Sequence, residues 1–138
     1  MSYGFVYVLG NRAMPGVYKV GYTERSPSLR CEELSRSTSV PCEFDLICYA
    51  EYTQAHAREQ EIHRLLAGVR VSPDREFFKC DLVRITDLVM DEELAISVST
   101  HQMEPFLYAD SPIFRERLCV ADELARDIGI VTADVPRT

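Results

Sequence analysis

Four polar side chains within residues 54–67 have the types and the spacing to bind a metal ion. They lie at positions i, i+3, i+4 and i+7, which a helix places on one face: His56, Glu59, Gln60 and His63. A single glutamate with water ligands suits Mg²⁺ or Mn²⁺. Two histidines with one glutamate, here His56, Glu59 and His63, would suit Zn²⁺. The solvated face of an amphipathic helix has the same composition, so the helix alone leaves these readings open.

A phenol and an ammonium form a second candidate group. Residues 5–9 and 17–21 are apolar, β-branched and aromatic, and the turn formers of residues 10–16 separate them, which indicates a β-hairpin. Because side chains alternate along a strand, Tyr7 and Lys19 would project from one surface if the register aligns them. A strand otherwise built of core residues rarely carries a lysine without a role.

An arginine lies where a helix does not favour one. Ser26-Pro27 is typical of a helix start, and the helix should continue to about Arg36. Arg30 therefore lies in the first turn, at the positive end of the helix dipole, which suggests a functional placement. An exposed arginine paired with Glu33 or Glu32 explains the position equally well.

The elements that must position these residues follow from the pattern of apolar residues and breakers. We expect a third strand over 43–51, a helix over 54–67 capped by Thr53, a strand or buried turn over 76–80, a helix over 82–96, a loop over 98–110 and a helix over 112–128. This order predicts an α+β fold with a small three-stranded antiparallel sheet flanked by helices and an added C-terminal helical segment.

Composition and charge limit the protein class. The 138 residues suit one domain, and the apolar runs are shorter than the ~18 residues of a membrane span, so we expect no membrane partner. Five cysteines without a CxxC pair favour reduced thiols in the cytoplasm. Residues 1–80 carry ten basic and ten acidic side chains, whereas residues 81–138 carry five and twelve. The acidic C-terminal part disfavours a simple DNA-binding module.

Taken together, the order of these features resembles the GIY-YIG endonuclease superfamily. The matching residues are Tyr7 in the first strand, Lys19-Val20-Gly21 in the second, Arg30 in the first helix, Glu59-Gln60-Glu61-Ile62-His63 in the next helix and Arg75-Glu76-Phe77-Phe78. The sequence is most similar to the small phage and bacterial branch in which lysine begins the second motif. The resemblance covers residues 4–80.

The resemblance implies a role for each matched residue. Tyr7 would orient or deprotonate the attacking water, Arg30 would steady charge on the phosphate and Glu59 would bind the single metal ion, Mg²⁺ or Mn²⁺. Lys19 and Gly21 match the second motif, and His63 and Glu76 belong to the pattern of the branch. An ordinary phenol has a pKa of ~10, so we expect Lys19 to lower the pKa of Tyr7 by favouring the phenolate.

The expected function is thus metal-dependent hydrolysis of phosphodiester bonds in DNA. Residues 1–80 would form the nuclease core, with Tyr7, Lys19, Arg30, Glu59 and His63 as catalytic residues. Residues 81–138 would form an acidic helical extension on or beside the core, and its helices offer a contact for a homodimer. The alternative is a non-catalytic adaptor or regulatory protein on the same fold, which the acidic extension and the absence of a targeting module favour.

Overall fold

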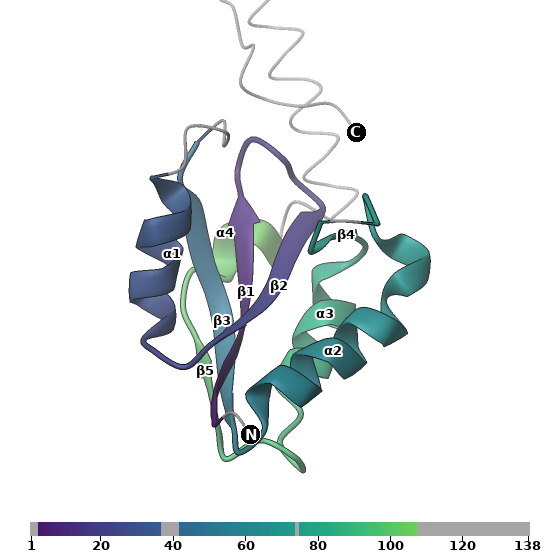
Figure 1. The fold of residues 1–138 in the computed structure, drawn as a ribbon. Coiled ribbons are helices and arrows are strands. Elements are labelled where there is room, and N and C mark those ends of the chain that lie inside the picture. The colour runs from purple at the N-terminus through teal and green to yellow at the C-terminus, as the bar shows by residue number, and fades with distance from the viewer. Residues whose placement is uncertain (1–2, 37–41, 74, 108–138) are drawn as a thin grey trace, which may run out of the picture.

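The computed structural model describes residues 3–36, 42–73 and 75–107 of the chain (Figure 1). These residues form, in chain order, β1 (Gly4–Asn11), β2 (Val17–Thr23), α1 (Pro27–Ser35), β3 (Phe44–Tyr52), α2 (Ala55–Leu65), the 3₁₀ turn η1 (Ala67–Val69), β4 (Phe77–Lys79), α3 (Leu82–Val89), β5 (Ser97–Thr100) and α4 (Glu104–Leu107). The predicted helix over 112–128, and with it the predicted dimer contact, lies outside the described residues. No helix in the described part is long and apolar enough to cross a bilayer.

The predicted hairpin is confirmed. β1 and β2 pair antiparallel, with Tyr7 opposite Gly21 and Leu9 opposite Lys19. Residues opposite each other in an antiparallel pair point to the same face, so Tyr7 and Lys19 do share one surface of the sheet. The turn that joins the strands contains Gly16, whose φ of 81° is a conformation that favours glycine.

The prediction of a three-stranded sheet is wrong. The sheet has five strands in the order β4-β2-β1-β3-β5, and every neighbouring pair is antiparallel. β4 adds to the free edge of β2, and β5 adds to the free edge of β3. The first is only three residues long, and the second is polar and mostly exposed, so neither carries the apolar alternation that identifies a strand. The general α+β class stands.

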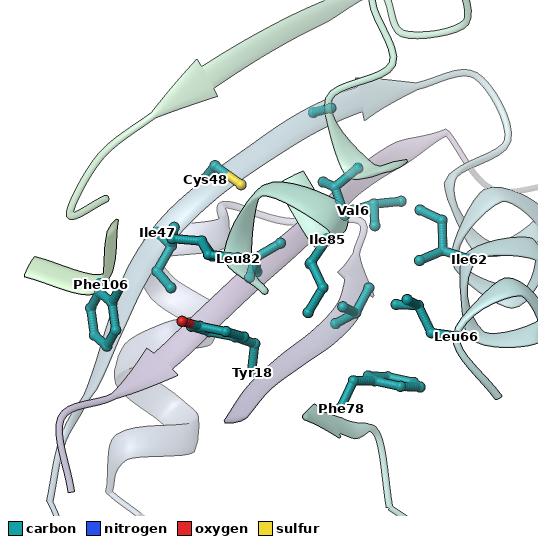
Figure 2. Close-up of a cluster of buried hydrophobic side chains, with 14 of the residues drawn as sticks. Val6, Tyr18, Ile47, Cys48, Ile62, Leu66, Phe78, Leu82, Ile85 and Phe106 are labelled. Atoms are coloured by element: carbon teal, nitrogen blue, oxygen red, sulfur yellow. The ribbon is translucent and has the colours of Figure 1, made fainter. Parts of the chain in front are cut away.

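The sheet separates two unequal layers of helices. Figure 1 shows α1 on one side of the sheet, with α2 and α3 on the other. The larger apolar cluster lies under α2, α3 and α4, and Figure 2 shows Ile62, Ile85 and Phe106 meeting the strand residues Val6 and Tyr18 there. The smaller cluster lies under α1 and consists of Tyr7, Leu9, Cys31, Phe44 and Leu46.

Two helices differ from the sequence prediction at their ends. α3 ends at Val89 and not at Ile96, because Asp91 ends it: its side chain accepts from the Glu93 amide, and its carbonyl accepts from the Ala95 amide. α2 begins at Ala55, and the residue that precedes it is Gln54, which makes no side-chain capping bond, so the predicted Thr53 cap is also wrong. The start of α1 is as predicted, since the Ser26 hydroxyl accepts from the Leu29 amide.

Candidate active site

The Tyr7 phenol lies across Gly21. A β-carbon on Gly21 would contact the phenol oxygen and would lie 2.6 Å from the ring carbon that carries it, so only glycine fits under the ring at this register position. A glycine within a strand often marks a place where a backbone or a ligand approaches closely. Here the space over Gly21 is filled by the phenol of Tyr7 from the opposite strand, and Tyr7 is 2% exposed.

Arg30 reaches the phenol from α1. Its guanidinium lies near enough to the Tyr7 hydroxyl to favour the phenolate, and it donates to Glu33 at 3.2 Å. Arg25 binds both oxygens of the same carboxylate, at 2.8 and 3.1 Å. Arg30 is therefore paired with Glu33, as one of the two readings expects, and it also lies beside the candidate catalytic phenol.

Tyr7 stays protonated at neutral pH. Burial raises the pKa of Tyr7 to about 12, and the nearby carboxylates of Glu76 and Glu59 raise it further, while Arg30 lowers it. The predicted lowering of this pKa by Lys19 is thus wrong, because burial has the largest effect and the nearest cation is Arg30. At neutral pH the phenol can donate a hydrogen bond and orient a water molecule, but it cannot serve as a ready base.

Lys19 is bound to a carboxylate that sequence analysis left without a role. Its ammonium lies 2.9 Å from Glu76 Oε2 and 5.5 Å from the centre of the Phe77 ring. The Glu76 carbonyl accepts from the Val20 amide at 3.2 Å, which holds the residue against the edge of β2. Because the pairing of β4 with β2 ends at Lys19, this contact continues the edge toward Gly21.

Glu59 and His63 come from α2, where they lie one turn apart and are 3% and 7% exposed. His63 Nε2 lies 2.8 Å from the Val20 carbonyl, and its Nδ1 lies 3.9 Å from Glu59 Oε1. The side-chain amide of Gln60 donates to Glu59 Oε1 at 2.7 Å. Burial, the largest effect, raises the pKa of the Glu59 carboxyl, and His63 acts in the opposite direction.

The structure brings the predicted site residues together around Glu76. Ligand atoms of Glu59, His63 and Glu76 all lie within 4.8 Å of one another. Lys19 forms an ion pair with Glu76, and the charges of Glu59, Glu76 and Arg30 each shift the pKa of Tyr7. Five separate segments, namely β1, β2, α1, α2 and the residues before β4, thus build one polar cluster.

His56 is not part of the group able to hold a metal. Its ring stacks on Tyr22, with 4.5 Å between the ring centres, and among the described residues the group able to hold a metal contains Glu76 in its place. The combination of His56, Glu59 and His63 that would suit zinc is therefore not the one that the structure assembles. The resemblance placed Glu76, just before Phe77-Phe78, in the pattern of the branch but gave it no role as a metal ligand.

Comparison with known proteins gives one match. A family model described as the T5orf172 domain, a phage-associated nuclease-like domain, matches residues 4–92. The matched range contains every residue of the cluster. No curated protein and no solved structure matches the chain significantly.

Proposed function

Because the chain belongs to the T5orf172 domain family, we propose that it is a metal-dependent endonuclease that hydrolyses phosphodiester bonds in DNA with a site of the GIY-YIG type. One observation carries the proposal. A phenol, two cations and a buried carboxylate, from segments over fifty positions apart, meet in one cluster. Phosphodiester hydrolysis requires these parts, namely an oriented water, cations near the nonbridging oxygens and a metal site.

The cationic side chains and the neutral phenol would have different roles in the reaction. Arg30 and Lys19 would hold the nonbridging oxygens of the phosphate, because they are the cations nearest to Tyr7 and Glu76. Tyr7 would orient the attacking water by hydrogen bonding, as its pKa of about 12 keeps the phenol protonated. Arg30 fits this role, since it lies beside the phenol of Tyr7 and its hydrogen bond to Glu33 keeps the guanidinium in place.

Glu59 is the residue proposed to hold the divalent cation, Mg²⁺ or Mn²⁺. The residues fit such an ion, because a carboxylate that is 3% exposed lies close to two further groups able to bind a metal, and among the described residues only Gln60 donates to it. When bound, the ion would neutralise charge on the phosphate and lower the pKa of a coordinated water. The remaining positioning is done by protein side chains.

Cleavage of supercoiled plasmid by the purified chain tests the proposal. We expect nicking or linearisation that requires Mg²⁺ or Mn²⁺ and stops with chelator. Glu59→Ala and Tyr7→Phe should each lower the rate by ~10²–10³-fold, the usual effect of removing one such group. Glu61→Ala, on the exposed side of the same helix, is the matched control and should cleave normally. Equal rates in all four proteins would point to contamination or to another site.

A second candidate function has one observation in its favour. Both proposed phosphate-binding cations are already paired with carboxylates, Lys19 with Glu76 and Arg30 with Glu33. A non-catalytic adaptor or regulatory protein on this fold would keep such neutral pairs as structure. That alternative predicts no cleavage by the wild-type chain with any divalent ion, and unchanged partner binding in Glu59→Ala.

A further inference from the structure

Three groups that can accept a hydrogen bond or bind a metal lie close together in Glu59, His63 and Glu76. The Val20 carbonyl can only accept, so the Nε2 atom of His63, 2.8 Å away, must carry a hydrogen. In the neutral ring, Nδ1 then carries a lone pair and no hydrogen. It lies 3.9 Å from Glu59 Oε1, which is beyond hydrogen-bond distance. A carboxylate oxygen of Glu76 lies within 4.8 Å of a ring nitrogen of His63 and of a carboxylate oxygen of Glu59. Gln60 and Lys19 each bond one of the two carboxylates, and a cation among the three groups would offset the repulsion that remains.

The surroundings of the two α2 residues match those of metal ligands. A ligating histidine usually donates its other ring N–H to a carbonyl or carboxylate, which fixes the tautomer and the ring orientation. The Val20 carbonyl does this for His63, and the Gln60 amide orients Glu59 Oε1. His63 is only 7% exposed, and its Nδ1 atom lies 3.9 Å from Glu59 Oε1, so this nitrogen has carboxylates rather than solvent as its neighbours.

We propose that Glu59, His63 and Glu76 together form a three-ligand site for a divalent transition-metal ion. The inference rests on the proposed function for the role of the ion and extends it, because Glu76 and the His63 imidazole become ligands beside Glu59. The proposal also sets a preference among metals. Mg²⁺ favours oxygen ligands, whereas one imidazole and two carboxylates suit Mn²⁺ better.

Lys19 is the internal competitor of that ion. Its ammonium already neutralises one oxygen of Glu76 at 2.9 Å and is itself only 13% exposed. A bound cation must therefore share Glu76 with a fixed positive charge, which weakens binding. Removal of that charge should tighten metal binding, whereas removal of any ligand should weaken it. The two kinds of variant have opposite expected signs.

Mn²⁺ binding to the full chain without DNA tests the inference. Calorimetry on chelator-treated protein should give one Mn²⁺ per chain, with Mg²⁺ at least ~10-fold weaker. Glu76→Gln and His63→Gln should each lower Mn²⁺ affinity at least ~10-fold, and Lys19→Met should raise it about 5-fold. Glu61→Gln on the exposed side of α2 is the control and should bind as the wild type does.

A measurement on the wild-type chain guards against variants that fail to fold. Electron spin echo spectroscopy of bound Mn²⁺ should show coupling to an imidazole nitrogen, and Mn²⁺ should raise the melting temperature. No Mn²⁺ binding, no nitrogen coupling, equal Mg²⁺ affinity or wild-type affinity in folded Glu76→Gln would each overturn the three-ligand site. Metal binding as expected without DNA cleavage would instead overturn the proposed nuclease and leave this site standing.

Discussion

The two faces of the sheet serve different purposes. The face under α2 and α3 is almost wholly apolar, with Val6, Ile62 and Ile85 fully buried. The face under α1 has a smaller apolar cluster, and Tyr7 within it contacts Arg30. α2 serves both tasks, since Ile62 points into the larger cluster while Glu59 and His63 reach the polar site at the β2 edge. Stability and chemistry are therefore largely separable by substitution.

The largest expected effect tests the apolar face. Ile85→Ala should lower the free energy of unfolding by about 2 to 5 kcal/mol, because it leaves a cavity among fully buried side chains. Leu34→Ala, on the half-buried side of α1, should cost only about 1 kcal/mol. Chemical denaturation of both variants gives the comparison. Equal losses would mean that the two clusters share the stability evenly.

The next effect concerns the pH dependence of the α1 face. The pKa of Tyr7 is about 12 in the folded chain, above the ordinary value of 10.0. The unfolded chain therefore releases this proton first, so stability is complete below pH 10 and is lost as pH rises from 10 to 12. The loss should approach about 2 to 3 kcal/mol. The Tyr7→Phe variant has no phenol to titrate, so its free energy of unfolding should fall by about 2 to 3 kcal/mol less than that of the wild type between pH 10 and 12. Chemical denaturation at several pH values would measure the difference.

A smaller effect tests the contact between the hairpin strands. Gly21→Ala should push the phenol away and lower the free energy of unfolding by about 1 to 3 kcal/mol. Cleavage should fall with it. Gly68→Ala is the matched control, since a β-carbon there meets nothing within 4 Å. If Gly21→Ala behaves like this control in denaturation and cleavage, the phenol does not depend on the glycine.

The smallest effect concerns the site itself. Burial raises the pKa of Glu59, so its charged form is unfavourable in the folded chain, and stability from this group is lost as pH rises through the folded pKa. Glu59→Gln should therefore raise the free energy of unfolding at neutral pH without metal, by about 0.5 to 2 kcal/mol, the usual size of a stabilising substitution. A loss of stability in the melting curve would show that the carboxylate is structural.

Local signals made the hairpin and the start of α1 predictable. Turn formers separate the two apolar runs, and Ser26-Pro27 marks the first turn of the helix. The residue types of Tyr7, Arg30 and Glu59 also pointed to chemistry before any coordinates. Their assembly in one cluster agrees with the order of the motifs along the chain.

Other features depended on contacts that no local pattern encodes. β5 is polar, so it pairs with β3 without an apolar alternation that sequence reading could detect. Lys19 and Glu76 are 57 positions apart, and their ion pair arises only when β4 joins the edge of β2. The direction of the Tyr7 pKa shift depends on burial, which a neighbouring lysine in the sequence could not reveal.

Val20 binds two of the three proposed metal ligands, His63 and Glu76, through its main-chain atoms alone. Its carbonyl binds His63 and its amide binds the Glu76 carbonyl. An alanine scan would therefore report Val20 only as a buried hydrophobic residue, because alanine keeps both main-chain bonds. Semisynthesis could reach them: an ester in place of the amide at residue 20 would remove the bond to Glu76 and leave every side chain intact.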